Sequence, residues 1–375
     1  MIVKDEERFL DECLSSVKQF VDEIIIIDTG STDKTVEIAK KHKAKIFSFP
    51  WQQDFAAARN FSVEKASGDW ILILDADERI APDDFIKLRS LLTNAKFQGM
   101  SLEQRNYTNE SSSKGWYPAE GLFAKDFKGY FHSYICRVFQ NNPNFRFRYK
   151  VHELVEDSIL ENKGIVVKSP IIIHHYGSSK GKLDKYLGLG LQQIKETPDN
   201  AKPYYDVGLI YVEQKKLDLA KAMFEKAASI DENYMFPYTL IGDIYVGEGK
   251  LPTAKKYYEK SIKLRNDLNA WLNLGVVYDR QGKDADAAKC FEKVLSLEPR
   301  MIQAYNNLFV LLLKTKRYIS AWRLLRVAVE KTGLEEFKVK KESFRNKLLV
   351  VVEKELKNKP ENIELLNFRD ALLQE

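Results

Sequence analysis

The sequence predicts an α/β domain with a Rossmann-like, mostly parallel sheet, followed by an all-α domain of repeated helix pairs. The first half of the chain alternates short apolar segments with helix-type segments, as expected for strands that helices join into a parallel sheet. The second half repeats the same glycine, aromatic and alanine positions at a period of about 34 residues, which is typical of paired-helix repeats.

The predicted sheet contains three strand-type segments, which two helix-type segments connect. Residues 23–28 (EIIIID) are apolar enough for a buried strand, and residues 31–43 begin with Ser, Thr and Asp and end in lysines, as helices do. A second strand is predicted at residues 44–49, a second helix at residues 54–66 and a third strand at residues 70–74. The third strand lacks polar alternation, which indicates a strand that is covered on both faces.

The segment that follows, residues 97–178, has a less regular pattern with aromatic strand-type runs. Residues 106–121 within it are rich in Ser, Asn, Gly and Trp and predict a loop. We interpret this loop either as a mobile lid or as a surface insertion. The first domain is therefore placed at residues 1–180.

The second half repeats one pattern of residues. The copies can be aligned on three glycines and one phenylalanine: Gly208, Gly242, Gly275 and Phe309. In each copy an aromatic residue precedes this position and an alanine follows it. The pattern predicts four tetratricopeptide repeats at residues 201–334, in which small residues let the two helices of a repeat pack closely. A linker helix is expected at residues 181–200 and capping helices at residues 335–375.

Composition excludes several classes of protein. With 375 residues, 44% of them hydrophobic and 30% charged, we expect a folded chain of two domains. The net charge of +5 comes without a basic cluster, which argues against nucleic-acid binding. No apolar run is long enough to span a bilayer, no signal peptide is recognised, and the three cysteines are far apart, so we expect a cytoplasmic protein without a membrane span.

Two aspartates, Asp75 and Asp77, directly follow the third strand. Open α/β sheets bind ligands at the carboxyl ends of their strands. Carboxylates in this D-x-D arrangement can hold a divalent cation, which neutralises the charge of a departing diphosphate. The alternative is a solvated strand end at residues 77–78 followed by a helix that begins at residues 81–84 (APDD).

The N-terminal half resembles, motif by motif, the inverting family 2 glycosyltransferases with a GT-A fold. The matching motifs are MIVKDEERFLDECLSSV, EIIIIDTGSTDKT and WQQDFAAARNFSVEKASGDWILILDADE, at residues 1–17, 23–35 and 51–78. Together with the repeats, the chain is similar to a bacterial subgroup that joins such a domain to tetratricopeptide helices. Members of that broad group modify peptides or proteins, or build surface glycans.

The resemblance implies a nucleotide-sugar site at the strand ends. Its implied residues come from an N-terminal strand and turn at residues 2–6, the end of the strand at residues 23–28, the second helix and the D-x-D motif: Val3, Lys4, Glu6, Asp28, Thr29, Arg59, Asp75 and Ala76. Arg59 is implied to reach the diphosphate or base, and Asp75 the ribose or a metal-bound water. Asp77 is implied as the direct metal ligand. Thr29 stands where many relatives carry a second aspartate, so this position supplies no carboxylate for recognition of the base.

Two later segments also match the family. In residues 148–157 (RYKVHELVED), the match to "V-H-E" implies Glu153 as the base that accepts the acceptor's proton, with Asp157 in reserve; a charged start of a surface helix is the alternative. In residues 171–177 (IIIHHYG), the match implies a histidine as a second metal ligand. Neighbouring residues of a strand face opposite ways, and the match to "H-Y-G" favours His175 over His174.

We therefore expect a metal-dependent inverting glycosyltransferase of the hexosyltransferase type, using Mn²⁺ or Mg²⁺. The resemblance implies a nucleotide-sugar donor, expected to be a UDP-sugar, and a peptide, protein or surface-glycan acceptor. The repeats are expected to bind the acceptor or to form a homodimer. Two alternatives remain: a repeat scaffold with a vestigial catalytic domain, and a sugar nucleotidyltransferase, which the lack of a Gly-rich phosphate loop disfavours.

Overall fold

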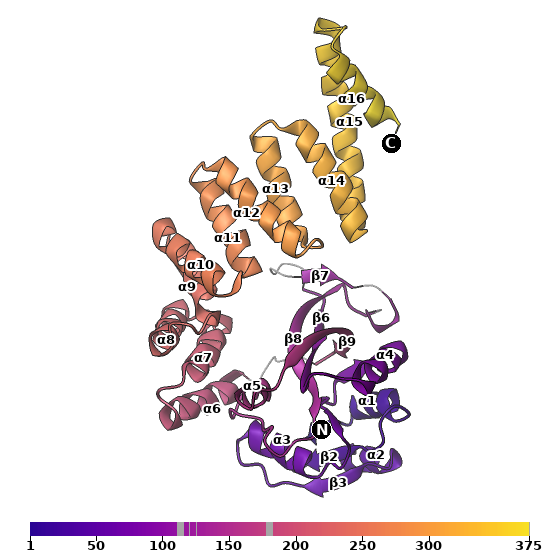
Figure 1. Ribbon diagram of the computed structural model, residues 1–375, viewed down its shortest axis with the longest axis vertical. Helices are drawn as coiled ribbons and strands as arrows, with labels where there is room; N and C mark the ends of the chain where they lie inside the picture. Colours follow the sequence, from indigo (N-terminus) through magenta and orange to yellow (C-terminus); the bar gives the residue numbers. More distant parts are fainter. Residues whose placement is uncertain (111–115, 120, 125, 178–182, 375) are drawn as a thin grey trace. The chain divides into compact units, whose positions relative to one another are not determined.

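The computed structural model forms two compact units, Met1–Ile230 and Asp231–Glu375 (Figure 1). It describes residues 1–110, 116–119, 121–124, 126–177 and 183–374. The first unit contains both β-sheets and the first helices of the repeat region, and the second contains the remaining helices. None of the described helices is long and apolar enough to cross a lipid bilayer.

A small parallel sheet lies at the N-terminal end of the first unit. Its strands are, in order, β1 (Ile2–Val3), β2 (Ile25–Asp28) and β3 (Lys45–Ser48). The connecting helices are α1 (Leu10–Val17) and α2 (Thr35–Lys41). Ile26 and Ile27 at the middle of β2 are fully buried, as the apolar run predicts for a strand covered on both faces.

The second sheet is mixed. Its order is β4 (Trp70–Leu72), β8 (Gly129–Gln140), β6 (Gly99–Thr108), β9 (Val166–His175) and β5 (Glu78–Ile80), with β7 (Trp116–Pro118) against β8. Of these pairs, β6 and β9 are parallel and the others antiparallel. The expected α/β fold is confirmed, but β4 pairs antiparallel with β8 instead of continuing the parallel series. Local periodicity cannot reveal a partner that lies so far along the chain.

The predicted loop at residues 106–121 is wrong in part. Its first residues continue β6 to Thr108, and Trp116–Pro118 form β7. Residues 111–115 and 120 lie outside the described residues, so the choice between lid and insertion stays open. The aromatic content of this segment explains the strands, because aromatic side chains pack well on a pleated surface.

Helices cover the mixed sheet and position the ends of its strands. They are α3 (Phe55–Glu64), α4 (Pro82–Thr93) and α5 (Glu156–Glu161), with a short 3₁₀ turn at Leu122–Ala124. Asp54 caps α3 by accepting the N–H of Ala57 at 2.9 Å, and α4 starts with Pro82, where a proline costs no hydrogen bond. The cap and the proline therefore fix the first residues of α3 and α4, close to the ends of the strands that precede them.

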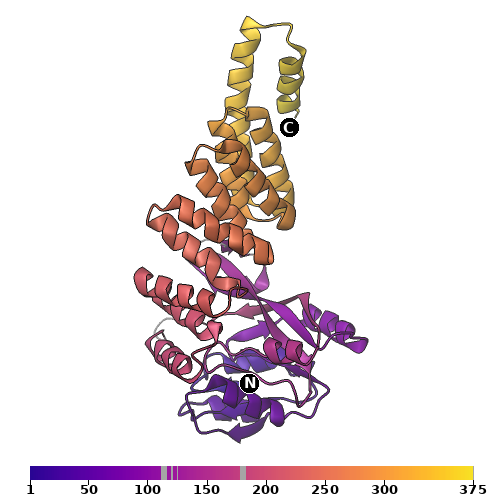
Figure 2. The same cartoon turned by 60° about the vertical axis from the view of Figure 1, so that its left-hand side comes forward.

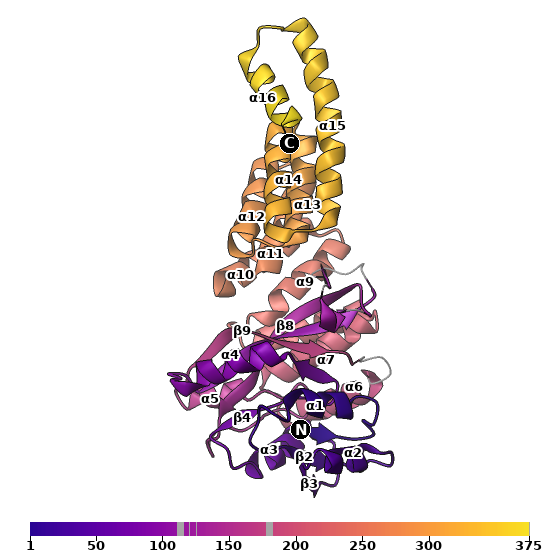
Figure 3. The ribbon, with the colours of Figure 1, turned by 90° about the vertical axis from the view of Figure 1, so that its right-hand side faces the viewer.

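Paired helices follow in both units (Figures 2 and 3). The first unit ends with α6 (Leu183–Glu196), α7 (Ala201–Glu213) and α8 (Leu217–Ile230). The second contains α9 (Phe236–Gly247), α10 (Leu251–Arg265), α11 (Leu268–Arg280), α12 (Asp284–Leu297), α13 (Ile302–Lys314), α14 (Tyr318–Thr332), α15 (Glu335–Asn358) and α16 (Ile363–Leu373). α15 and α16 share one apolar cluster with Trp322 of α14.

The repeat glycines are required by close helix packing. A Cβ added at Gly242 or Gly275 would lie 2.5 Å from the ring of Tyr258 or Phe291, the aromatic residue of the paired helix. No side chain fits at that distance, so glycine lets the two helices approach. In the fourth pair the position is Phe309, whose ring instead packs edge-on against Phe344 of α15 at 5.2 Å.

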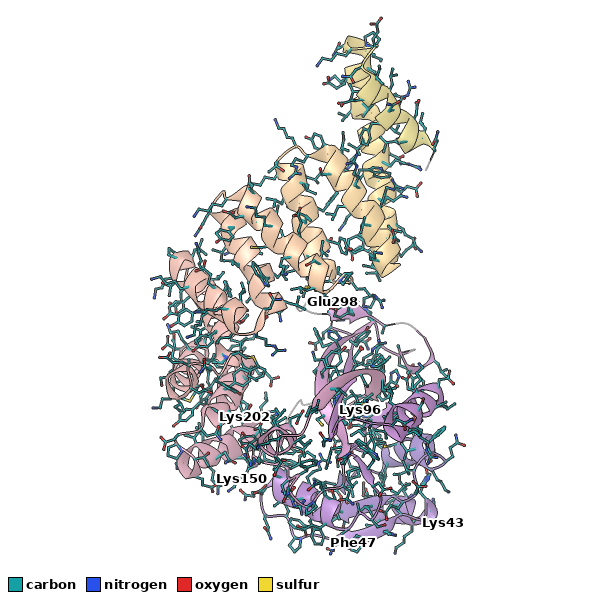
Figure 4. The ribbon with its side chains drawn as sticks, viewed as in Figure 1. Lys43, Phe47, Lys96, Lys150, Lys202 and Glu298 are labelled. Atoms are coloured by element: carbon teal, nitrogen blue, oxygen red, sulfur yellow. The ribbon has the colours of Figure 1, made fainter. Side chains whose placement is uncertain are left out.

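α6 and α7 pack against the N-terminal part of the first unit. The side chain of Lys150 forms an ion pair with Glu196 of α6 at 2.6 Å, and the backbone N–H of Lys150 donates to the side chain of Gln193. Lys202 of α7 lies over the ring of Tyr149 at 4.5 Å; Figure 4 labels both lysines. The expected linker helix therefore belongs to the same compact unit as the sheets, which places its side chains near the strand ends.

Candidate active site

A cavity of about 530 Å³ opens at the carboxyl ends of β1 and β4. Every site residue predicted from the sequence except Asp28 lines it: Val3, Lys4, Glu6, Thr29, Arg59, Asp75, Ala76, Asp77, Glu153 and His175. These residues come from six separate segments of the chain. The fold therefore brings together in one cavity the residues that the resemblance implied.

Asp28 and Thr29 shape the end of β2. The Asp28 carboxylate accepts the N–H of Ser31 at 3.0 Å, as aspartates in turns often do. The Thr29 hydroxyl donates to the carbonyl of Val3 at 3.1 Å and is buried. Asp28 is not among the residues that line the cavity, so its observed contact is with the turn that starts at Gly30.

Asp75 is held between two buried arginines. Arg59 donates to its Oδ1 at 2.9 Å and Arg137 to its Oδ2 at 3.1 Å. Burial alone would raise the pKa of Asp75, but the two guanidinium charges outweigh burial and hold it far below its usual range. Asp75 is therefore an ionised carboxylate with both oxygens in use, fixed in position at the cavity wall.

Glu78 holds both Asp75 and Arg137 in place through hydrogen bonds. Its side chain is fully buried, and it accepts the N–H of Asp75 at 2.8 Å and a hydrogen bond from Arg137 at 2.7 Å. Gln104 donates to the same carboxylate. Burial raises the pKa of Glu78, although the Arg137 charge opposes this. The alternative of a solvated strand end at residues 77–78 is thus wrong for Glu78.

Arg59 also connects Asp75 to Glu153. Its Nη2 lies 2.9 Å from Glu153 Oε1, and the Arg59 side chain is only 4% exposed. Burial would lower the pKa of Arg59, but the charges of Asp75 and Glu153 raise it above its usual value. Within the described residues no hydrogen bond engages Oε2 of Glu153, whose side chain is 15% exposed at the cavity.

Asp77 and His175 form a second pair in the cavity. Antiparallel pairing of β5 with β9 sets Glu78 opposite His175, and Asp77 Oδ2 then lies 3.4 Å from His175 Nε2. Burial would lower the pKa of His175, but the hydrogen bond and charge of Asp77 raise it above its usual value. The buried Nδ1 of His175 has no partner among the described residues.

His174 points the other way, as strand geometry requires. Its Nδ1 lies 2.7 Å from the Tyr107 hydroxyl, and its ring stacks on Phe123 at 4.2 Å. Burial lowers the pKa of His174 to about 4. The structure therefore places His175, and not His174, beside Asp77.

The Asp77 and His175 side chains fit part of a divalent-metal site. A carboxylate oxygen and an imidazole nitrogen are ligands for Mn²⁺ and related ions, and both side chains are partly exposed to the cavity, at 21% and 24%. In the part of the chain that the structure describes, no group of three or more His, Cys, Asp or Glu side chains could hold a metal. The remaining coordination positions would therefore fall to oxygens of a bound ligand or water.

Several residues of the cavity were not predicted from the sequence. Trp51, Phe55 and Tyr186 form an aromatic wall, with Trp51 4.7 Å and Tyr186 6.1 Å from the Phe55 ring. Lys185 lies over Trp51 at 4.9 Å. Lys185 and Tyr186 come from α6, and no local pattern connects that helix with the strand ends. Arg137, which holds Asp75 but is not among the residues that line the cavity, had a usable signal, since it is an arginine within the otherwise apolar run ICRVF.

Asp157, the reserve candidate for a base, lies elsewhere. It accepts a hydrogen bond from the Tyr149 hydroxyl at 2.6 Å and is not among the residues that line the cavity. α5 begins only at Glu156, so Glu153 lies in the segment before the helix and not on it. Of the two carboxylates considered, Glu153 alone reaches the cavity.

Comparison with known proteins identifies both parts of the chain. Residues 1–155 match the model of glycosyl transferase family 2, and residues 201–234, 237–268 and 268–301 match tetratricopeptide repeat models. Crystal structures of MamA cover 43% of this chain and 94% of their own at a TM-score of 0.39 and 24% identity, a score too low to support an inference about function.

Three curated relatives illustrate the similarity. A tetratricopeptide-repeat-containing protein of Synechococcus elongatus is 37% identical over 49% of this chain and 43% of its own length. The prophage-derived glycosyltransferase SunS of Bacillus subtilis is 27% identical over 54% of this chain and 46% of its own. An uncharacterised glycosyltransferase of Haemophilus influenzae is 42% identical over 25% of this chain and 41% of its own.

The chain thus spans less than half the length of these relatives. The family match covers the strand ends, Arg59, the D-x-D residues and Glu153. The chain therefore carries a glycosyl transferase family 2 domain at residues 1–155, followed by C-terminal tetratricopeptide repeats.

Proposed function

We propose that this protein is a cytoplasmic, metal-dependent inverting glycosyltransferase. Its proposed donor is a nucleotide-sugar, specifically a UDP-sugar. The observation that carries the proposal is the cavity in which the Asp77–His175 pair, Arg59 and Glu153 meet. Sugar transfer from a nucleotide diphosphate requires ligands for a cation, a positive group near the diphosphate and a carboxylate that accepts a proton. The cavity offers two candidate cation ligands, a buried arginine and such a carboxylate.

Each residue has a role that follows from its surroundings. Asp77 and His175 would hold Mn²⁺ or Mg²⁺, which when bound neutralises the charge of the diphosphate leaving group. Asp75, fixed by Arg59 and Arg137, presents a constant negative charge to the ribose side of the donor. Glu153 accepts the proton of the acceptor nucleophile through Oε2, while Arg59 holds Oε1 and so sets the orientation of the carboxylate.

The aromatic wall suggests where the sugar rings bind. Trp51, Phe55 and Tyr186 present apolar ring faces beside Glu153, and such faces suit the C–H faces of sugars or apolar side chains of a peptide. We infer that the acceptor is a peptide, protein or surface glycan, bound with the help of the repeats. The alternative role of the repeats is a homodimer, which light scattering on the full-length protein would reveal.

The first test is binding and turnover with a panel of nucleotide-sugars. UDP plus Mn²⁺ at about 100 times its dissociation constant is expected to raise the melting temperature of the first unit by about 5–10 °C. UDP in the presence of EDTA should give a much smaller shift. Slow nucleotide release from one donor, followed by mass spectrometry of candidate peptide and glycan acceptors, then identifies donor and acceptor.

The same experiments separate the alternatives. A vestigial domain predicts no shift with any nucleotide and no release from any donor. A nucleotidyltransferase predicts pyrophosphate release from a nucleoside triphosphate and a sugar phosphate, and no transfer from a nucleotide-sugar. Either result would contradict the proposed function.

Gly177→Ala is expected to disable the site without unfolding the protein. A Cβ at this position would overlap the Asp77 carboxylate and lie 2.9 Å from His175 Nε2, so the pair must move apart. A displacement of about 1 Å can cost ~10²-fold in rate. Gly188→Ala on α6 is the matched control, because nothing lies within 4 Å of its added Cβ. Equal transfer rates in the two variants would show that the Asp77–His175 geometry is not needed.

A further inference from the structure

The loop that carries Glu153 is closed by a pair of backbone hydrogen bonds. Arg148 donates to the carbonyl of Leu154 at 2.9 Å, and Leu154 donates back to the carbonyl of Arg148 at 3.1 Å. Residues 148–154 are called the Glu153 loop below. Because Glu153 directly precedes the closing residue, the shape of this loop decides where its carboxylate lies relative to Arg59.

The backbone of the Glu153 loop is strained at two residues. Tyr149 has a φ of 74° and His152 a φ of 52°. Both values lie in the left-handed region, where the Cβ of any residue other than glycine crowds the backbone. Such conformations cost free energy and persist only where surrounding contacts fix them. The loop therefore depends on partners outside itself.

Helix α6 supplies one of these partners. Gln193 Oε1 accepts the backbone N–H of Lys150 at 2.9 Å, and the Lys150 ammonium group pairs with Glu196 of the same helix at 2.6 Å. The Lys150 carbonyl accepts the N–H of Phe55, the first residue of α3, at 3.1 Å. Because α3 also carries Arg59, Lys150 connects the Glu153 loop both to α6 and to the helix of its arginine partner.

Helix α7 holds the loop at the residue before Lys150. Its Lys202 and Asp206 form an ion pair at 2.6 Å, with side chains that are only 9% and 10% exposed. The Lys202 ammonium group lies 4.5 Å from the centre of the Tyr149 ring (Figure 4 labels Lys202), and a desolvated cation is attracted to such a ring. Separating a buried ion pair is costly, so Asp206 keeps Lys202 over Tyr149.

We propose that Gln193 and the Lys202–Asp206 pair are positioning residues for Glu153. They hold the strained Glu153 loop in the conformation that sets Glu153 Oε1 2.9 Å from Arg59 Nη2. These three side chains are not among those that line the cavity, so they act on Glu153 through the loop and not on a bound ligand. The inference rests on the proposed function, which gives Glu153 its role as the proton acceptor.

The catalytic unit then extends beyond the family 2 match at residues 1–155. It includes α6 and α7, which belong to the same compact unit as both sheets. The two helices pack closely, since a Cβ added at Gly190 of α6 would lie 2.7 Å from Val207 of α7. The alternative is that α6 and α7 only stabilise the fold, without any specific effect on Glu153.

Gln193→Leu tests the proposal, because leucine is close to glutamine in size but cannot accept the Lys150 N–H. The transfer rate at saturating donor and acceptor should fall ~10- to 100-fold, as expected when a catalytic group moves by about 1 Å. UDP plus Mn²⁺ should stabilise the variant as much as the wild type. Gln193→Glu keeps an acceptor oxygen and should restore most of the rate.

Gln192→Leu is the matched control. Gln192 is the neighbouring glutamine of α6, and its exposed side chain donates to Glu196 and not to the Glu153 loop. The control should transfer sugar at the wild-type rate. Amide exchange gives a readout that needs no activity: the N–H groups of Lys150 and Leu154 should exchange at least ~10-fold faster in Gln193→Leu than in Gln192→Leu.

A double variant separates positioning from general stabilisation. When Gln193→Leu is combined with Glu153→Gln, the remaining transfer rate should fall by less than ~2-fold, because residues that act through one group do not have additive effects. A purely structural role would lower the rate in both backgrounds by the same factor. That result would overturn the proposal, and so would a wild-type rate in Gln193→Leu.

Failure of the proposed function would give a different pattern. The wild-type protein would then transfer sugar from none of the donors, and the positioning role would be refuted together with the role of Glu153. If the wild type is active but amide exchange at Lys150 and Leu154 is unchanged in Gln193→Leu, the glycosyltransferase stands. The inference is then overturned by itself, because Gln193 does not hold the loop.

Discussion

Asp77→Ala is expected to reduce sugar transfer to background while the protein stays folded. The side chain is 21% exposed, packs in no apolar cluster and contacts chiefly His175, so its loss removes the proposed metal ligand and leaves the core unchanged. The metal-dependent rise in melting temperature with UDP should disappear with it. Nucleotide release assays and thermal melting with and without Mn²⁺ measure both effects.

Asp157→Ala is the matched control for this variant. It removes the same carboxylate from the same domain but breaks only a hydrogen bond to Tyr149, with an expected cost of about 1 kcal/mol in unfolding free energy. Transfer and the metal-dependent shift should survive. Wild-type transfer by Asp77→Ala, or equal losses in both variants, would remove Asp77 from the metal site.

The local elements of the fold were predictable because each has a local cause. The apolar run at residues 23–28 became β2, and the Asp54 cap and the Pro82 start placed α3 and α4 within a residue or two. The repeats were predictable because the pattern recurs, and the overlap of Gly275 with Phe291 explains why glycine must recur there. Helix and strand signals of this kind do not depend on distant partners.

Long-range features could not be predicted in this way. The antiparallel pairing of β4 with β8 brings Arg137 to Asp75, and no periodicity in either segment reveals it. Tyr186 of α6 lines the cavity because α6 packs against the segment that contains Lys150, whose backbone N–H donates to Gln193. The resemblance to a family supplied most of the site residues, including Arg59, but it did not supply Arg137, the second arginine that fixes Asp75.

The arginine pair also decides how two carboxylates of the cavity, Asp75 and Glu153, differ. Asp75 has both oxygens bound by guanidinium groups, and its pKa is held far below the usual range after burial is outweighed. Such a group is a poor proton acceptor at neutral pH. Glu153 shares Arg59 through one oxygen only. The structure therefore favours Glu153 over Asp75 as the group that accepts the acceptor's proton.

Glu153→Gln is expected to lower the transfer rate by ~10²–10⁴-fold, the usual contribution of a general base, with little change in donor binding. The amide oxygen can still accept the hydrogen bonds from Arg59, so the arginine keeps its position beside Asp75 and the cavity keeps its shape. What the amide cannot do is accept a proton. UDP plus Mn²⁺ should therefore stabilise this variant about as much as the wild type.

Glu161→Gln is the matched control, because Glu161 also pairs with an arginine, Arg148, but on the exposed surface outside the cavity. It should transfer sugar at the wild-type rate. The split between rate and binding is the decisive observation, since a purely structural role of Glu153 would weaken nucleotide binding and lower the melting temperature together. If donor binding falls tenfold or more while the rate at saturating donor is normal, Glu153 positions Arg59 and another group, or solvent, accepts the proton.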